Sequence, residues 1–496
     1  MFIFFKYFVY FLIFLSLLLF YFLFTPLGHA NIYHFIGEKL SKKNGVLIEV
    51  QSINIAYYPQ VRIVLNIEKK AKLTLWGHLD DALVDMDYTL RSDCIASEHC
   101  QIDDDIKIKG HVKGPFTKLF ITGKGKALDG NVTYQAVKYT DKVENVTLHL
   151  HDVNATKLAH LLGQKAFLKG KSNANVNFSL MNDKEKHGTI VYDVDDKNFK
   201  GIAIHLHSNI TINNDQHTFS IRANAPELTF NIDKGNYNQK TKQTKASYRL
   251  DVKSLHNLTK LLGYAYHGAL YTKGEILYTH TLKITGVSKS FGGVVNFLFE
   301  NHLLHMQLQN VSLENIMHLF DFPSILTAKT NGKIVYSFPH ETLHVHTTLN
   351  QAKFLPSKLV DVVQKKSHVD MKRETFENSI LDFTYYHHAI QGYLKLINPK
   401  SHVYLTNTKI ETQKSTIDAY FDFKMQQQEF SGKVYGALES PKVNLNMQKL
   451  IRYQMDKQVD KMIGKDGRKM MEHMPMGGVA KDMATDMGAS FMKVFF

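Results

Sequence analysis

Apolar and polar residues alternate along most of this chain, so that every second side chain is apolar. The alternation begins at residues 46–50, continues through residues 61–67 and recurs as far as residue 423. This pattern is typical of a β-strand with one buried face and one wet face. Asn-Asp, Asn-Gly and Lys-Gly turn chemistry separates the segments, as at residues 213–215. The pattern predicts a mainly β protein, with roughly 20–25 strands in an antiparallel sheet that is wet on one side.

The apolar positions of these strands are the candidate functional residues. They are Val176, Phe178, Leu180, Ile202, Ile204, Phe219, Ile221, Phe230, Ile334, Tyr336 and Phe421. A sheet with one apolar face must close on itself, pack under helices or bind an apolar ligand. The sequence predicts few helices, which leaves a closed barrel, a sandwich or an open groove. Phe-rich positions suit acyl chains, each buried methylene contributing about 0.8 kcal/mol. An open lipid groove is the favoured interpretation, and a closed core is the alternative.

Short helical patterns interrupt the strands at three places that resemble one another. Residues 152–163, 251–263 and 310–320 each follow a strand and open with a polar residue able to cap a helix. A turn and a Gly-containing strand come after each. We interpret them as three degenerate copies of a strand–helix–turn–strand unit, with chance resemblance as the alternative. A further helix is expected over residues 32–40, where apolar residues fall at helical spacing.

The two ends of the chain differ from the β region of residues 27–445. Residues 7–24 form an almost unbroken apolar run of about 18 residues, long enough for one membrane span. We expect residues 1–26 to be an uncleaved anchor, with signal cleavage near residues 28–30 as the alternative. Residues 446–496 are Met-rich, and Val479, Met483 and Met487 share one helical face. This amphipathic tail is expected to dock a partner protein or to lie in a membrane interface.

Composition and motifs narrow the function. The chain of 496 residues carries a formal net charge of +14, which favours nucleic acid or anionic lipid as a partner. Lys and Arg are spread along the chain without a dense cluster, so nucleic acid is not expected. No phosphate loop, nucleophile elbow or paired-glycine nucleotide motif is present. The sequence therefore predicts no enzymatic activity and no cofactor.

Cysteine, histidine and aspartate are the residue types of this sequence that could form a disulfide or a metal site. Cys94 and Cys100 are expected to form a disulfide in an oxidising compartment, with free thiols or a metal site as alternatives. Three His-x-His pairs, at residues 149–151, 205–207 and 344–346, are expected to be polar residues of wet faces. Residues 103–105 are three consecutive aspartates, expected to be solvated charge on a loop. No metal site is predicted.

Four segments together resemble the AsmA-like family of envelope proteins, bridge-like lipid-transfer proteins of the AsmA, TamB and YhdP type. They are the paired strands of residues 44–59, the glycine-spaced strands of residues 110–125, the Asp-Val helices followed by Gly strands at residues 152–171 and 251–276, and the Gly-x-Val-x-Gly and Pro-x-Val strands of residues 430–443. The resemblance spans most of the chain, and the order of the motifs carries it.

The resemblance implies a lipid-handling envelope protein. Such proteins resemble curled sheets whose apolar inner face shields acyl chains between the inner and outer membranes. By this comparison the chain is a single-pass inner-membrane protein, anchored through residues 7–24, with its bulk in the periplasm. It is expected to bind phospholipid or another anionic envelope lipid and to contribute to outer-membrane lipid homeostasis. An outer-membrane or envelope protein is the expected partner of the tail. A non-enzymatic scaffold with a closed β core is the alternative.

Overall fold

A computed structural model describes residues 26–44, 46–57, 59–95, 102–321, 324–357, 360–361, 364–365, 369–426 and 428–446. The predicted anchor at residues 7–24 and the Met-rich tail after residue 446 lie outside these ranges. Cys100 and the side chain of Cys94 also lie outside them, so the predicted disulfide stays a prediction. None of the helices within the described ranges has both the length and the apolarity that a membrane span requires.

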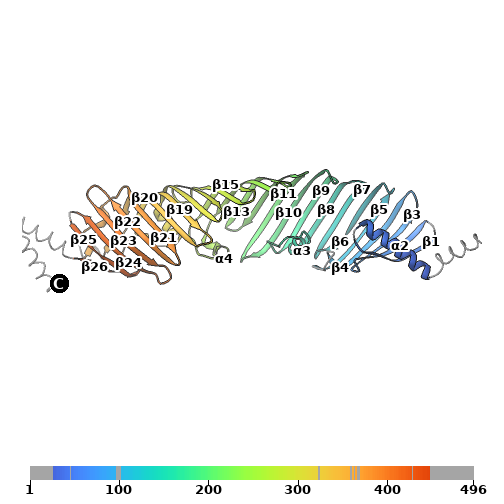
Figure 1. Ribbon diagram of the computed structural model, residues 1–496, viewed down its shortest axis with the longest axis horizontal. Coiled ribbons are helices and arrows are strands. Elements are labelled where there is room, and N and C mark those ends of the chain that lie inside the picture. The colour runs from blue at the N-terminus through green and yellow to red at the C-terminus, as the bar shows by residue number, and fades with distance from the viewer. Residues whose placement is uncertain are drawn as a thin grey trace, which may run out of the picture. The chain divides into compact units, whose positions relative to one another are not determined.

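The described chain is mainly β, as the alternation predicts. Its 26 strands form one antiparallel sheet that is not closed. The chain divides into two compact units, Met1–Ala246 and Ser247–Phe496, and the boundary falls within β14 (Gln243–Val252). Figure 1 labels many of the elements of both units.

In the first unit each strand pairs antiparallel with the next one along the chain. The strands are β1 (Ile48–Tyr57), β2 (Gln60–Ile67), β3 (Ala71–Leu79), β4 (Val84–Ile95), β5 (Ile102–Gly114), β6 (Lys118–Ala127), β7 (Gly130–Tyr139), β8 (Val143–Asn154), β9 (Lys171–Met181), β10 (Lys186–Phe199), β11 (Ile202–Asn213), β12 (Gln216–Ala225) and β13 (Leu228–Asn238).

The second unit repeats this sequential antiparallel pairing from β15 to β26. Its strands are β15 (Leu270–Tyr278), β16 (Leu282–Ser288), β17 (Val294–Glu300), β18 (Leu303–Ser312), β19 (Leu326–Ser337), β20 (Thr342–Phe354), β21 (Ser379–Tyr386), β22 (Ala389–Ile397), β23 (His402–Glu411), β24 (Thr416–Met425), β25 (Gln428–Ala437) and β26 (Lys442–Asn446).

Helix α2 (Pro26–Asn44) covers the free edge of β1, and it includes the helix expected over residues 32–40. The Ser41 hydroxyl accepts a hydrogen bond from the N–H of Ile48 at 2.8 Å, and the Tyr33 hydroxyl donates to the carbonyl of Ile53 at 3.2 Å. Gly37 is buried against β1, where a Cβ would lie 2.8 Å from the Ile48 carbonyl oxygen. An uncovered edge strand exposes backbone groups that can pair with another chain, so α2 protects this edge.

The three predicted helical segments are present. They are α3 (Ala155–Leu161), the 3₁₀ turn η1 (His256–Leu258) with α4 (Thr259–Leu262), and α5 (Leu313–Leu319). Before α3 and α5 the strand bulges at Asp152 and Asn310, which have positive φ angles of 54° and 52°. Each bulged N–H is bound by an asparagine side chain of the next strand, and the following valine is fully buried. This shared geometry supports the predicted strand–helix–turn–strand unit.

Tight hairpins account for several turns. Leu128 and Asp129, between β6 and β7, both have positive φ, as type I′ hairpin turns require. His387 and His388 do the same between β21 and β22, with φ of 45° and 61°. That histidine pair is therefore a hairpin turn.

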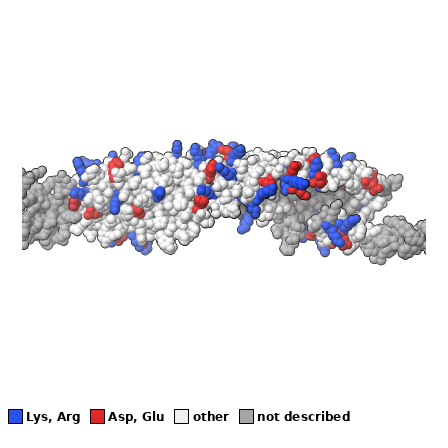
Figure 2. All heavy atoms as spheres, turned by 45° about the horizontal axis from the view of Figure 1, so that its top comes forward, with Lys and Arg blue, Asp and Glu red and all other residues white. Residues whose placement is uncertain are grey.

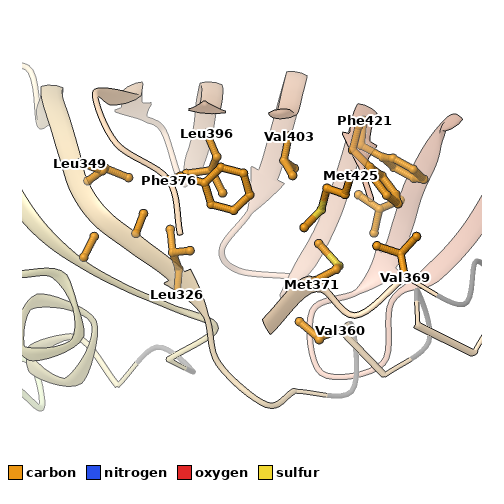
Figure 3. Close-up of a cluster of buried hydrophobic side chains, with 14 of the residues drawn as sticks. Leu326, Leu349, Val360, Val369, Met371, Phe376, Leu396, Val403, Phe421 and Met425 are labelled. Atoms are coloured by element: carbon orange, nitrogen blue, oxygen red, sulfur yellow. The ribbon is translucent and has the colours of Figure 1, made fainter. Parts of the chain in front are cut away.

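The apolar side chains of the second unit form a packed cluster at one margin of its sheet. The connection between β20 and β21 contributes Val360, Val369, Met371 and Phe376, which pack against Leu349, Leu396, Val403, Phe421 and Met425 of the strands. Figure 3 shows the connection and the strand side chains pointing toward one another. The connection therefore covers the apolar side chains of this part of the sheet, although the sheet itself is not closed.

Candidate functional site

One face of the first unit carries an apolar row that crosses every strand from β1 to β13. The cross-strand pairings place one residue of each strand in this row. In order they are Ile53, Ile63, Leu75, Tyr88, Gly110, Gly123, Tyr134, Leu148, Val176, Ile190, Ile210, Phe219 and Gly235. We call the face that contains this row the apolar face of the first unit.

A second row runs beside the first on the same face. It consists of Val50, Leu65, Leu73, Leu90, Ile108, Gly125, Val132, Leu150, Ala174, Tyr192, Ser208, Ile221 and Ile232. Ser208 is its only hydroxyl-bearing aliphatic residue. Because a one-residue slip would move these side chains to the opposite face, the two rows fix the register of the sheet.

The apolar face is only partly shielded from solvent. Most side chains of the first row, including Leu75, Val176 and Ile210, are half-buried. Side chains under a second packed layer are fully buried, as Leu349 and Leu396 are in the cluster of Figure 3. Within the described residues of the first unit, most of the first row is therefore not fully covered, whereas Val132, Leu150 and Ala174 of the second row are buried in a packed cluster.

The predicted groove residues of the first unit lie on this face. Val176 and Phe219 belong to the first row and Ile221 to the second. The others share its alternation and are also half-buried: Phe178, Leu180, Ile202, Ile204 and Phe230. Sequence reasoning missed Tyr88, Tyr134, Tyr192 and the glycines of the rows, because glycine and tyrosine do not stand out in a hydrophobic alternation.

Aromatic rings lie across several glycines of this face. Phe178 covers Gly188, and Phe219 covers Gly235. A Cβ added to Gly123 would lie 2.5 Å from the Tyr134 ring and 2.6 Å from the Tyr88 hydroxyl, closer than any real Cβ approaches. The missing side chains therefore let the rings lie flat, and the rings replace the apolar surface that glycine lacks.

Two tyrosines meet over a pair of these glycines. The Tyr88 hydroxyl lies 2.5 Å from that of Tyr134 and also donates to the Thr122 carbonyl oxygen at 2.9 Å. Burial and the hydrogen bond with Tyr134 raise the pKa of Tyr88 well above its usual range, because neither favours a phenolate. Both hydroxyls therefore have hydrogen-bond partners, and this part of the face consists of carbon and neutral oxygen.

The second unit repeats this arrangement. The Tyr248 hydroxyl donates to the Thr285 carbonyl oxygen at 3.2 Å, as Tyr88 does to Thr122. Gly286 lies under both Tyr248 and Phe297, much as Gly123 lies under Tyr88 and Tyr134. The two units therefore share one local arrangement, in which a tyrosine hydroxyl bonds a threonine carbonyl and the tyrosine lies over the following glycine.

The second unit also carries a half-buried row from β15 to β25. Its residues are Ile276, Ile284, Phe299, Leu304, Tyr336, Leu343, Tyr385, Ile390, Ile410, Ile417 and Gly436. The predicted groove residue Tyr336 lies in this row and Ile334 lies next to it on the same face. Phe421 shares the face but is only 9% exposed, and it packs against Phe430 inside the closed cluster.

The opposite face of each unit is polar, and its His-x-His residues pair across the strands with acids or, for His149, His151 and His344, with Asn or Thr side chains. His205 bonds Asp195 and His207 bonds Asp193, each at 2.7 Å, while His346 bonds Asp382 at 2.7 Å. The His-x-His residues thus lie on a wet face, where the sequence predicted them. In the described part of the chain, no group of three or more His, Cys, Asp or Glu residues is arranged to hold a metal ion.

The three consecutive aspartates do not form the expected solvated loop. They belong to β5, and Asp104 is buried, whereas Asp105 is exposed and pairs with Lys107. The Asp104 carboxylate accepts from the Leu128 N–H and from the Lys157 ammonium, the latter at 3.1 Å. The loop prediction was wrong because the partner, Lys157, lies on α3, more than fifty residues along the chain.

Charged groups of both signs are intermingled on the molecular surface seen in Figure 2. Many of them form exposed ion pairs, such as Lys113 with Asp85 and Lys433 with Asp418, each at 2.7 Å. Such pairs contribute little stability.

No family model matches the chain, and a search of curated proteins finds no match either.

Proposed function

We propose that this protein binds lipid acyl chains along its apolar face and carries lipid within a cell envelope. One observation supports this most strongly: in each unit an apolar row crosses successive strands while its side chains remain half-buried. Binding acyl chains would remove this surface from water, with a gain of about 0.8 kcal/mol per buried methylene.

The proposal includes the setting that the resemblance to AsmA-like envelope proteins implies. Residues 7–24 anchor the chain in an inner membrane, and the β region lies in the periplasm and contributes to outer-membrane lipid homeostasis. The ligand is a phospholipid or another anionic envelope lipid. The polar opposite face, with its paired His and Asp residues, suits a protein whose outer side stays in water while its inner side shields hydrocarbon.

A second candidate function is a scaffold without bound lipid. The packed cluster of the second unit favours it, because Val360, Val369, Met371 and Phe376 already cover part of that unit's sheet. The two functions differ in what occupies the remaining half-buried row, which is lipid in one and solvent or a partner protein in the other.

The test compares substitutions on the two faces of the same strand. Ile210→Asp changes the apolar face of β11, and Thr211→Asp places the same charge on its polar face. Val176→Asp and Asn177→Asp form the matching pair on β9. Each full-length variant is extracted from its own envelope in detergent, and its bound phospholipid is counted by native mass spectrometry. Far-ultraviolet circular dichroism checks that each variant is folded.

We expect several copies of phospholipid on the unsubstituted protein and on both polar-face variants. The apolar-face variants should lose most of them, because an aspartate among acyl chains would have to be desolvated. Lipid held only by the anchor would be equal in all five proteins. That outcome, or a folded protein without lipid, would replace the carrier function with the scaffold.

A further inference from the structure

Two loops project from the ends of strands, and each is closed by one backbone hydrogen bond. We call residues 155–170, with α3, the first knuckle, and residues 255–268, with η1 and α4, the second knuckle. The Ala155 N–H donates to the Gly170 carbonyl oxygen, and the Leu255 N–H donates to that of Gly268, both at 2.9 Å. Both helices end at a Leu-Leu-Gly sequence whose glycine, Gly163 or Gly263, is left-handed.

Each knuckle separates its apolar side chains into two sets. In the first knuckle, Ala155 and Leu168 are buried in a cluster with Val194 of β10. Leu161, Leu162 and Phe167 are 42%, 67% and 75% exposed, although one side of the Phe167 ring contacts Phe199 of β10 at 5.1 Å between ring centroids. Large exposed apolar side chains gathered in one loop mark an interaction site more often than isolated ones do.

The second knuckle has the same division. Leu255 and Leu258 are buried, whereas Leu262 and Tyr264 are exposed, Tyr264 by 56%. The two knuckles lie in different units and share no residue. In each, the second leucine of the Leu-Leu-Gly sequence is exposed, and so is an aromatic side chain that follows it.

Charge indicates the kind of partner. Neither knuckle contains Asp or Glu. The first knuckle has exposed lysines at Lys165 and Lys169, the second has Lys260, and the exposed Lys253 lies two residues before the second. Elsewhere both signs are intermingled, as Figure 2 shows. A protein partner is commonly met by a rim of mixed polar residues. Acids of other segments pair with Lys157 and His267 of the two knuckles, namely Asp104 and Asp129 with Lys157 and Asp321 with His267. The exposed lysines named above take part in none of these pairs, and exposed lysines beside exposed Leu, Phe and Tyr are the composition that binds an anionic bilayer surface.

We propose that both knuckles contact the surface of an anionic lipid bilayer. Leu162, Phe167, Leu262 and Tyr264 enter the boundary between headgroups and acyl chains, and the lysines meet lipid phosphates. This contact goes beyond the carrier function, because a scaffold without bound lipid would make it equally well.

The experiment measures depth in the bilayer at single positions of the full chain. Trp76 is the only tryptophan, so Trp76→Phe provides a silent background. Leu162→Trp and Leu262→Trp place a probe on each knuckle, and Thr211→Trp and Thr406→Trp place one on exposed polar-face positions as controls. The proteins are reconstituted in phosphatidylcholine vesicles with or without phosphatidylglycerol, with brominated acyl chains as quenchers.

We expect quenching and a blue shift at both knuckle probes, only with phosphatidylglycerol present, and neither at the control probes. Lys165→Glu with Lys169→Glu should abolish the quenching at residue 162. Equal quenching at all four probes, or none at the knuckles, overturns the proposal, as does quenching that ignores phosphatidylglycerol. Native mass spectrometry of Leu162→Asp with Phe167→Asp separates this contact from the carrier function, since bound lipid should remain while vesicle contact is lost.

Discussion

The hydroxyl groups of Tyr88 and Tyr134 meet at 2.5 Å although the two residues belong to β4 and β7, which two other strands separate. They can meet because Gly110 and Gly123, on the intervening strands, leave room for the rings to lie flat on the sheet. A contact across four strands ties together segments that otherwise interact only through their neighbours.

Adding a methyl group beneath these rings should be costly. Gly123→Ala would force both tyrosines off the sheet, and we expect a loss of about 1–3 kcal/mol in the free energy of unfolding. Tyr134→Leu removes one obstruction, so Gly123→Ala should cost less in that background than in the native one. Urea unfolding of the four proteins of this cycle measures the difference. Additive losses would show that the rings do not need the glycine.

The ion pair between Lys157 and the buried Asp104 should contribute more to the free energy of unfolding than an exposed lysine of the same knuckle does. Lys157→Met leaves the Asp104 carboxylate with backbone donors alone, and we expect a loss of about 1–3 kcal/mol at neutral pH. Lys165→Met, on the exposed side of the same knuckle, should change stability by less than about 0.5 kcal/mol. Equal effects of the two substitutions in urea unfolding would contradict the assignment.

Acid should remove part of the stabilisation that Lys157 provides, because Lys157 also binds the Asp129 carboxylate. The hydrogen bond from Lys157 lowers the pKa of Asp129 below its usual value, and burial of the carboxyl opposes this shift only in part. A carboxyl group whose pKa is lowered by folding stabilises the protein above its unfolded-state pKa, and this contribution is lost as pH falls through the folded-state value. The stability difference between the native protein and Lys157→Met should therefore be constant from pH 7 to about 5 and should narrow below about pH 4. A difference that widens in acid would contradict this reasoning.

Truncating two side chains of β22 should cost different amounts of stability, because one lies in the packed cluster of the second unit and the other in its half-buried row. Leu396 is 0% exposed in the packed cluster, whereas Ile390 is half-buried in the row of that unit. We expect Leu396→Ala to cost about 2–5 kcal/mol, because it leaves a cavity, and Ile390→Ala to cost clearly less. Bound phospholipid should raise the cost of Ile390→Ala alone, because only that side chain would touch the lipid. Thermal unfolding with and without lipid checks both statements.

The edge of β1 should become reactive when α2 is displaced. Gly37→Val would bring a bulky side chain against the Ile48 carbonyl, and Ser41→Ala removes the acceptor that the Ile48 N–H uses. We expect faster amide hydrogen exchange at Ile48 in both variants and association through the exposed edge. Lys42→Ala, which alters only an exposed pair with Glu38, is the control. Unchanged exchange in all three variants would show that α2 does not protect this edge.

The alternation in the sequence predicted which residues share a face, because side chains of a strand alternate strictly. Val176, Ile204 and Phe219 therefore lie together as expected. The alternation could not show that Phe421 would be covered. The residues of the connection that complete its cluster, such as Val369 and Phe376, follow no regular apolar period, and their packing depends on how that connection folds back over the strands.

Contacts between residues far apart in the chain were the other feature that the sequence could not predict. The predicted solvation of Asp104 failed because its burial depends on Lys157, and only the folding of β5, β6 and α3 together brings them into contact. Similarly, neither Tyr88 nor Tyr134 indicates the other in the sequence. The register that joins them is the sum of three successive pairings between β4 and β7, each set by its own turn.

The sequential pairing has a consequence for how such a sheet can change in length. In the first unit the strands β11 and β12 form one hairpin, residues 202–225, and they bond only β10 and β13 on either side. Removing that hairpin would leave β10 antiparallel to β13 with their apolar side chains on the same face, whereas removing one strand would reverse every strand that follows. The hairpin is therefore the smallest modular unit of such a protein, and gene duplication in steps of two strands would lengthen its apolar surface without redesigning the rest.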